Sequence, residues 1–393
     1  MWYNKTMIFL DNASTTKPDE EIVNKFVEYQ KYYFNPGANY SPSISISKKI
    51  DEIRNDIVKL LNGEVPGTFI FTPSSTIANN TILNSVVSNN KNEEYIFSSL
   101  EHPSVYNIAN KLFLSGRKVK FVDSLPSGEI DEKQLLSMIN ENTKFVSLIN
   151  VSNETGVVNN VNELAKKIKE INPKTLVHSD GVQAFGKIET SVKNLDFYTI
   201  SSHKIYGLKG IAGFYCKNLK SLKTLILGGG QEFDIISGTT NAPMIFSFFD
   251  AIKNAEKNLN ENFEKVLKLN KILRSEISKI SDVEINSPEV FKNVSSENKP
   301  SCYCSPYILS ISVLGLNAET IQNMLSKAEI YVGLGSACSA KKSGNRVLQA
   351  LKKTKSEILG NIRISLSKNT TKEEIETFIE ELKSCISKLK ENL

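Results

Sequence analysis

A lysine follows directly after one of the apolar, β-rich runs of this chain. Lys204 stands in Ser201-Ser202-His203-Lys204-Ile205-Tyr206-Gly207, just after the run Phe197–Ser201. Ligands of open α/β sheets bind beyond the carboxyl ends of the strands, and a lysine desolvated there becomes a usable amine nucleophile. Ser201 and His203 would add a hydroxyl and a ring donor beside it. Taken alone, an ordinary exposed lysine is the more common outcome of such a pattern.

An aspartate ends another predicted strand in His178-Ser179-Asp180-Gly181-Val182-Gln183. The two-residue period of a strand puts His178 and Asp180 on one face. A carboxylate at that edge could hold a cationic ring nitrogen. The alternative is that Asp180 caps a helix, and from these residues alone the capping role is favoured.

A third segment, Phe71-Thr72-Pro73-Ser74-Ser75-Thr76, closes a strand and opens a helix. Its small hydroxyl residues would leave backbone N–H groups exposed at the positive end of the helix dipole, which is a ready phosphate site. Simple helix capping explains the segment equally well.

Two further residues suit sulfur and carboxylate chemistry. Cys338 lies in a Gly/Ser-rich loop and is followed by Lys341 and Lys342, which favour the thiolate over the inert, buried alternative. Arg363 interrupts the alternating strand Asn361–Ser365, where a guanidinium could bind a carboxylate or form a structural ion pair.

Strand-like runs alternate with helical stretches between residues 68 and 216, which predicts a mostly parallel seven-stranded sheet flanked by helices. After Gly230 we expect one long charged helix, Met244 to about Ile280, straight or kinked, with solvated faces. A smaller α+β unit follows. The predicted division is a large domain at 15–256, with 1–14 and 257–393 forming the small one. The predicted strands are Thr68–Phe71, Glu94–Ser98, Lys118–Val122, Lys144–Ile149, Thr175–Ser179, Phe197–Ser201 and Ile211–Cys216; the predicted helices between them are Thr76–Val87, Ser104–Leu114, Asp131–Ile139 and Val161–Ile171; the predicted tail elements are strand Tyr307–Leu314, helix Ala318–Lys327, a helix near Val347–Lys352, strand Asn361–Ser367 and a helix from Thr371.

Composition narrows the function classes. The 393 residues carry a net charge of only +5, which demands neither a nucleic acid nor an anionic membrane as partner. We see no apolar run of about 18 residues and no secretory or transit signal. Five cysteines form no disulfide framework, and three histidines argue against a multi-histidine zinc enzyme. Cys302-Tyr303-Cys304 lacks the two-residue spacing of a zinc site, so we expect no bound metal. Because the sequence shows neither a secretory or transit signal nor a disulfide framework, we expect a cytoplasmic protein.

A lysine, an aspartate, a helix-start anion site and a carboxylate-binding arginine are together what pyridoxal phosphate chemistry needs. With these residues in view, the chain resembles the cysteine desulfurase family of fold-type I pyridoxal-phosphate enzymes nearly end to end. The segments that carry the resemblance are Phe9-Leu10-Asp11-Asn12-Ala13-Ser14-Thr15-Thr16, Glu101-His102-Pro103-Ser104-Val105, Val151-Ser152-Asn153-Glu154-Thr155-Gly156, His178–Gln183, Ser201–Gly207 and Gly335-Ser336-Ala337-Cys338-Ser339.

The resemblance implies a role for each matching residue. Lys204 would be the Schiff-base lysine, and Cys338 the nucleophile that becomes a persulfide as L-cysteine is converted to L-alanine. Around the cofactor ring, His102 would stack on the ring and assist proton transfer, Asp180 would pair with the ring nitrogen, and Gln183 and Asn153 would contact the ring oxygen. The cofactor phosphate would be held by Ser75, Thr76, Ser201 and His203. The substrate carboxylate would be held by Arg363 and Asn153. Thr239 would reach the phosphate of the other subunit in a homodimer, and the sulfur would pass to an acceptor protein such as an iron–sulfur scaffold or a thiolation factor.

The chain departs from the family pattern at Phe233 and Ile236, where the family has arginines. This leaves three alternatives open. The protein could be another pyridoxal-phosphate enzyme of the aminotransferase class V type, such as a selenocysteine lyase or an aminotransferase, or a paralogue with weak activity, or a scaffold without turnover.

Overall fold

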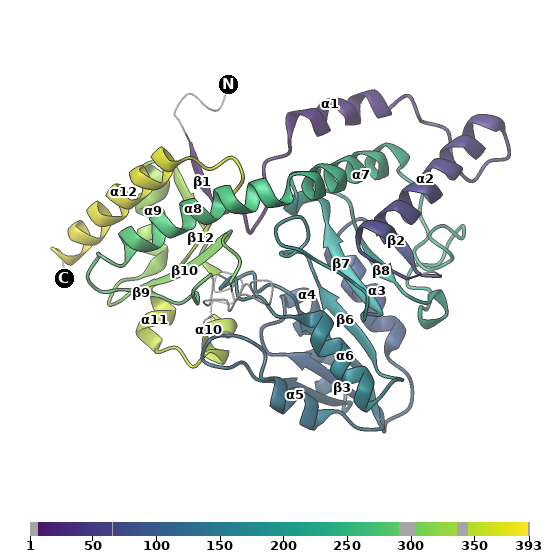
Figure 1. The fold of residues 1–393 in the computed structure, drawn as a ribbon, viewed down its shortest axis with the longest axis horizontal. Coiled ribbons are helices and arrows are strands. Elements are labelled where there is room, and N and C mark those ends of the chain that lie inside the picture. The colour runs from purple at the N-terminus through teal and green to yellow at the C-terminus, as the bar shows by residue number, and fades with distance from the viewer. Residues whose placement is uncertain (1–6, 65, 291–303, 336–344, 392–393) are drawn as a thin grey trace, which may run out of the picture.

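A seven-stranded sheet forms the centre of the larger part of the molecule (Figure 1). The computed structural model describes residues 7–64, 66–290, 304–335 and 345–391. The strand order is β2-β8-β7-β6-β5-β3-β4, and only β8 runs against the other six. Each strand lies within one residue of its predicted bounds, so the predicted fold class is confirmed. The strands are β2 (Thr68–Thr72), β3 (Glu94–Ser98), β4 (Lys118–Val122), β5 (Thr143–Ile149), β6 (Leu176–Asp180), β7 (Phe197–Ser201) and β8 (Ala212–Cys216).

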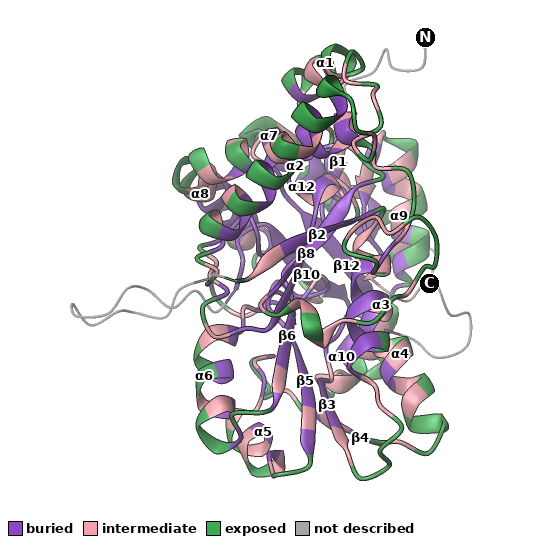
Figure 2. Ribbon diagram, turned by 90° about the vertical axis from the view of Figure 1, so that its right-hand side faces the viewer, coloured by how far each residue is buried: buried purple, intermediate pink, exposed green. Residues whose placement is uncertain are grey.

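Helices cover both faces of this sheet, and the strands between them are almost fully buried (Figure 2). Their starts follow from local sequence: Ser74 caps α3 by accepting from Ile77 N–H, and Pro103 occupies the first turn of α4. The four predicted helices are α3 (Ser75–Val86), α4 (Pro103–Leu114), α5 (Glu132–Met138) and α6 (Val161–Ile171).

Two N-terminal helices were not predicted. They are α1 (Glu20–Tyr29) and α2 (Ser41–Leu60). The buried face of α2 includes Ile46, Ile50, Ile53 and Ile57, spaced by three or four residues, which is the pattern that indicates an amphipathic helix. This spacing in the sequence could have predicted α2.

The prediction of one long charged helix is partly correct, because the kink that it allowed is a full break, and the prediction of solvated faces is wrong. The segment forms two helices, α7 (Ala242–Lys257) and α8 (Leu259–Ile277), which meet at Asn258 and run end to end across the molecule (Figure 1). They are also not simply solvated, because each is amphipathic. Ile245, Phe248 and Ile252 of α7 are buried against the large sheet, and α8 buries its own apolar face.

The rest of the chain builds two small sheets, one antiparallel in the order β12-β10-β9 and one parallel pair, β1-β11. One hydrophobic cluster joins Ile8 and Leu10 of β1 to residues of α8 and of the C-terminal helix. The predicted domain boundaries stay a prediction. The remaining elements are β1 (Ile8–Leu10), β9 (Val283–Ile285), β10 (Ile308–Val313), α9 (Ala318–Lys327), β11 (Ile330–Val332), α10 (Arg346–Ala350), α11 (Lys355–Leu359), β12 (Asn361–Ser365) and α12 (Lys372–Lys390), with short 3-10 turns η1 (Ser202–Lys204) and η2 (Leu219–Ser221).

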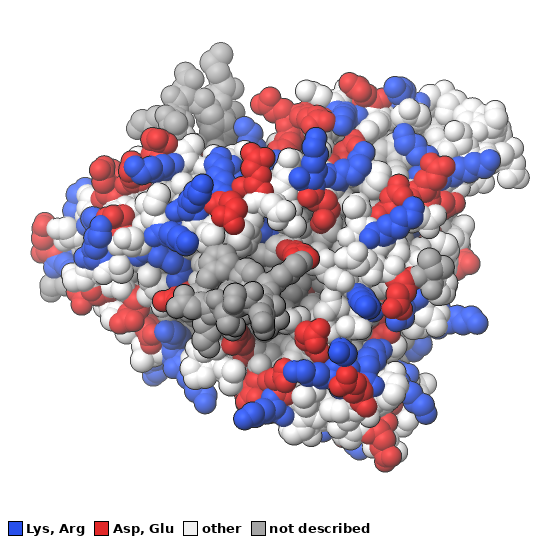
Figure 3. All heavy atoms as spheres, in the orientation of Figure 1, with Lys and Arg blue, Asp and Glu red and all other residues white. Residues whose placement is uncertain are grey.

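Basic and acidic side chains are interspersed over the face shown in Figure 3, without a broad area of one sign. Within the described ranges, no helix is both long and apolar enough to cross a bilayer.

Candidate active site

One cavity of about 410 Å³ collects most of the residues singled out from the sequence. It lies beyond the carboxyl ends of β2, β3, β5, β6 and β7, where ligands of such sheets bind. Ala13, Ser14, Gly335 and Arg363 line it as well. The predicted residues in its wall are Ser75, Thr76, His102, Asn153, Asp180, Gln183, His203, Lys204 and Arg363.

Lys204 ends the short turn η1 directly after β7. Its Nζ donates to the carbonyl oxygens of Ala13 at 2.5 Å and Ser14 at 2.7 Å. Burial, followed by the nearby positive charge of Arg363, lowers the pKa of Lys204 to about 8. A substantial fraction of this amine is therefore neutral near pH 8, as a nucleophile or a base requires.

Asp180 is the last residue of β6 and is almost completely buried. Its Oδ1 accepts from Val182 N–H at 3.0 Å, and its Oδ2 accepts from the side-chain amide of Asn79 at 3.0 Å. The first contact is local and resembles the capping role. The second comes from α3 and fixes the carboxylate in the cavity wall.

Asn79 is a residue that sequence reasoning missed. Its Nδ2 bridges Asp180 and Ser104 Oγ at 2.9 Å, and its Oδ1 accepts from Thr199 Oγ1 at 2.8 Å. It lies one helical turn after Thr76 on the buried face of α3. A polar residue on the buried face of this helix was the sequence feature that could have indicated a role for Asn79.

This bridge sets the protonation of the His102 ring. The backbone N–H of Ser104 donates to His102 Nδ1 at 3.2 Å, and Ser104 Oγ lies 2.8 Å from the same nitrogen. Because Nδ1 accepts, the proton of the neutral ring sits on Nε2. Burial lowers the pKa of His102, which favours this neutral form. In its neutral form the His102 ring therefore presents an Nε2–H donor.

One end of the cavity is formed by the start of α3, whose backbone N–H groups could hold an anion. Ser75 and Thr76 form the first turn of α3, and among the described residues their backbone N–H groups have no acceptor. His203 also lines this cavity; its Nδ1 lies 3.1 Å from Thr15 Oγ1. Burial and the lysines around it lower the pKa of His203 to about 4, so this ring is neutral at pH 7.

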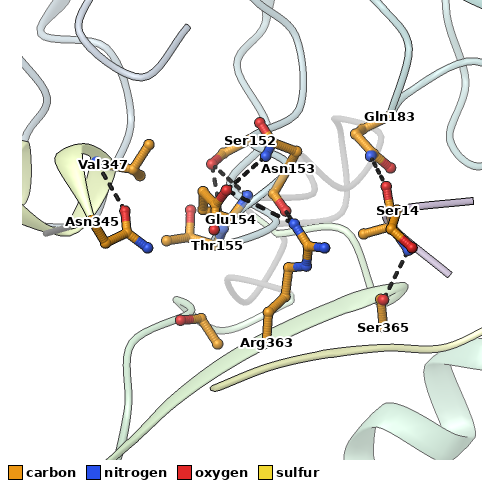
Figure 4. A network of polar contacts seen from close by, with 12 residues as sticks. Ser14, Ser152, Asn153, Glu154, Thr155, Gln183, Asn345, Val347, Arg363 and Ser365 are labelled. Carbon is orange, nitrogen blue, oxygen red and sulfur yellow. Dashed lines mark hydrogen bonds and ion pairs between the residues drawn. The ribbon is translucent and has the colours of Figure 1, made fainter. Parts of the chain in front are cut away.

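Arg363 reaches from β12 to the turn Asn153–Thr155 (Figure 4). Its Nη2 lies 2.8 Å from Asp11 Oδ1, its Nη1 donates to Asn153 O at 3.0 Å, and Glu154 Oε1 lies 3.8 Å away. The structural ion pair considered from the sequence is thus present. Gly333 permits this arrangement, because a Cβ there would lie 2.6 Å from Asp11 Oδ1 and 2.9 Å from the guanidinium.

Three predicted residues are not in the cavity wall. Ser201 is buried at the end of β7. Thr239 lines a separate pocket of about 150 Å³ with Phe71 and Glu232. Cys338 lies outside the described residues.

The loop that carries Phe233 and Ile236 in place of the family's arginines is contacted by a guanidinium from a distant part of the chain. Arg54 of α2 pairs with Glu232 through Nη2–Oε1 at 2.5 Å and lies over the rings of Phe71 and Phe233, 4.8 and 5.1 Å from their centres. Glu232 also accepts from Phe71 N–H at 2.8 Å. The loop is therefore anchored to β2 without the two arginines.

Comparison with known proteins agrees with this geometry. The model of the aminotransferase class-V family matches residues 8–378. The cysteine desulfurase of Trichormus azollae is 29% identical over 98% of this chain and 94% of its own length. Cysteine desulfurase IscS 1 of Archaeoglobus fulgidus is 30% identical, with 98% of each chain covered. A solved structure titled NifS-like protein superimposes with a TM-score of 0.87 at 29% identity, covering 97% of this chain and all of that one. The chain belongs to the aminotransferase class-V family and, within it, to the cysteine desulfurase family.

Proposed function

We propose that this protein is a pyridoxal-phosphate-dependent cysteine desulfurase that converts L-cysteine to L-alanine and passes the sulfur to an acceptor. The observation that carries the proposal is the shared cavity of Lys204 and Asp180. An amine with a pKa of about 8 faces the same space as a fixed carboxylate and an open helix N-terminus. Few ligands other than a phosphorylated pyridine aldehyde need these three groups at once.

The residues of the cavity fit this cofactor. The free N–H groups of Ser75 and Thr76, with Ser201 and His203, would hold its phosphate. Asp180 would hold the ring nitrogen, and His102, Gln183 and Asn153 would contact the ring and its oxygen. When bound, the cofactor supplies an electron sink that stabilises negative charge on the substrate carbon.

The chain's own groups supply proton transfer, substrate binding and the sulfur acceptor. Arg363 would bind the carboxylate of L-cysteine, exchanging part of its present contact with Asp11. The neutral amine of Lys204 would take the Cα proton. The Cys338 thiolate would then attack the substrate sulfur. The Cβ–S bond breaks, an S–S bond forms on Cys338, and Cβ keeps the electron pair and takes a proton. Return of a proton from Lys204 to Cα completes the balance as alanine plus a persulfide.

The test is an absorption spectrum of the purified protein with pyridoxal phosphate, before and after L-cysteine is added. We expect a visible band that borohydride bleaches, a spectral change on adding L-cysteine, and release of sulfide and alanine in the presence of a reductant. Lys204→Ala should lack the band and the products. A colourless wild-type protein would refute the proposal.

A second candidate is another class-V reaction on the same cofactor, such as selenocysteine cleavage or transamination. Replacement of the family's arginines by Phe233 and Ile236 is the observation that favours it. Cys338→Ala decides between the two: a desulfurase loses sulfur transfer, whereas turnover that continues undiminished points to the alternative reaction.

The remaining features of the proposal concern partners and compartment. The protein would act as a homodimer in which Thr239 contacts the phosphate of the other subunit. Its sulfur acceptor would be an iron–sulfur scaffold or a thiolation factor. The location would be cytoplasmic.

A further inference from the structure

A second buried lysine lies beside the cavity, and the proposed mechanism does not use it. The side chain of Lys187 is only 3% exposed. Its Nζ donates to Gln183 Oε1 at 2.9 Å and lies 5.9 Å from the centre of the Tyr307 ring. Within the described ranges it forms an ion pair with no carboxylate. Burial, followed by the nearby positive charges of Lys204 and Arg363, lowers the pKa of Lys187 to about 7. Burying such an amine without a counter-ion is unfavourable, so a gain in fold stability does not explain this lysine.

The hydrogen bond from Lys187 determines which way the Gln183 amide points. Lys187 Nζ donates to Gln183 Oε1, and the ammonium form has three donors and no acceptor, so the amide turns its oxygen toward Lys187. Gln183 Nε2 then donates to the carbonyl oxygen of Ala13 at 2.8 Å. A flipped amide would face oxygen with oxygen at Ala13 and nitrogen with nitrogen at Lys187. Both neighbours therefore select one orientation.

The same carbonyl connects this orientation to the reactive lysine. Ala13 O accepts from both Gln183 Nε2 and Lys204 Nζ. Gln183, Ala13 and Lys204 all line the cavity. A continuous set of hydrogen bonds thus runs from Lys187 through Gln183 and Ala13 to Lys204.

We propose that Lys187 is a positioning residue that holds the Gln183 amide with its N–H groups toward the cofactor's ring oxygen. The inference rests on the proposed function and adds to it a residue that nothing in the family resemblance singled out. By donating to an anionic oxygen, Gln183 lowers the proton affinity of the chromophore.

The experiment replaces Lys187 by methionine, which keeps the length of the side chain and removes its donors. The protein loaded with pyridoxal phosphate is titrated with pH while its visible band is followed. We expect the midpoint to rise by on the order of one pH unit, as for the loss of one hydrogen bond to a charged group. Cofactor affinity, from titration of the apoprotein, should fall about tenfold. Lys193→Met, at an exposed lysine, should change neither value.

Two further variants separate positioning from a structural role. In a Gln183→Leu background, adding Lys187→Met should not move the midpoint further, because Lys187 acts through Gln183. An equal shift in both backgrounds would overturn the proposal. The melting temperature of the Lys187→Met apoprotein should not fall, since an amine buried without a counter-ion is replaced by an apolar side chain. A midpoint unchanged by Lys187→Met alone would also overturn it.

If Lys187→Met does not fold, Lys187→Arg and Lys187→Gln carry the same test. Arginine only donates and should keep the wild-type midpoint, whereas glutamine can turn its own amide and should not. Equal midpoints for the two variants would overturn the proposal. A wild-type protein without a visible band would refute the proposed function instead, so the two failures are distinguishable.

Discussion

Asn79 joins two groups of the site that come from distant parts of the chain. It contacts Asp180, 101 residues away, and reaches His102 through Ser104. We expect Asn79→Ala to weaken pyridoxal phosphate binding about tenfold, because the carboxylate loses a donor and the histidine loses its fixed orientation. Titration of the apoprotein followed by absorbance measures this. Asn84→Ala, on the exposed face of the same helix, is the matched control, and equal affinities for both variants would contradict the role.

Glu101 gives the folded protein a predictable dependence on pH. The side chain is fully buried, Ser98 and Ser147 donate only to its Oε1, and burial followed by the charge of Asp180 raises its pKa to about 8. Since the folded state holds this proton more tightly than the unfolded state, Glu101 contributes stability below its ordinary pKa near 4.5 and loses it as pH rises to about 8.

Glu101→Gln should therefore flatten this dependence. Melting temperatures of the apoprotein measured between pH 5 and 8 should fall more slowly with pH for the variant than for the wild type. The two proteins should differ most at the alkaline end. Parallel curves would show that Glu101 is charged in the folded state throughout this range.

At the scale of elements, Arg346 ties α10 to the segment that carries His102. It donates to the backbone oxygens of Ser99 and Glu101, and its guanidinium carbon lies 3.8 Å from the centre of the Tyr106 ring. Arg346→Ala should lower the free energy of unfolding by about 2–3 kcal/mol, the loss expected for hydrogen bonds from a charged group. Urea unfolding of the apoprotein measures it.

The control for this prediction is Arg117→Ala. Arg117 makes a single exposed contact, to Asn90 O at 3.3 Å, and its loss should change stability by less than about 0.5 kcal/mol. Arg346→Lys keeps the charge but cannot reach both carbonyls in the same way. Its free energy of unfolding should lie between those of Arg346→Ala and Arg117→Ala. Equal urea-unfolding midpoints for Arg346→Ala and Arg117→Ala would show that α10 is held by other contacts.

Sequence periodicity was sufficient for the elements of the large sheet. Strands such as β3 and helices such as α6 have the predicted bounds because each is a regular run with its own cap or turn. The charge run from Met244 misled, since it hid the apolar stripe of α7 and the break at Asn258. Charged residues on one face of a helix say little about what the other face buries.

The site was predictable only where function follows from position along a strand. Asp180 ends the buried strand β6, and Lys204 ends the short turn that follows β7, so sheet topology brings the two residues together. Asn79 was missed because only tertiary structure brings its partners Ser104 and Asp180 near. Lys187 has its partner Gln183 four residues away and was missed because only the folded structure shows that it is buried beside the cavity. Arg54 was missed for the same reason as Asn79, since it meets Glu232 across 178 residues.

At the scale of the whole molecule, the N-terminal segment connects the two parts of the fold at the cavity. Leu10 is buried with β11 and β12 in the small sheets, and Ala13 and Ser14 accept hydrogen bonds from Lys204 of the large one. Asp11 pairs with Arg363 between these points. The amine and the guanidinium of the site are therefore held by one short stretch of chain, so movement of one part relative to the other would change both.

The proposed homodimer would complete the site from the loop that contains Thr239. This loop exposes Leu227 by 89% and Phe233 by 47%, and we expect a partner subunit to cover these two apolar side chains. We expect Leu227→Asp to halve the mass measured by light scattering and to weaken pyridoxal phosphate binding, because Thr239 no longer reaches the other subunit's phosphate. Leu114→Asp, at a residue 76% exposed on α4, should leave the mass unchanged. A wild-type protein that is already monomeric and binds the cofactor tightly would show that one chain makes the whole site.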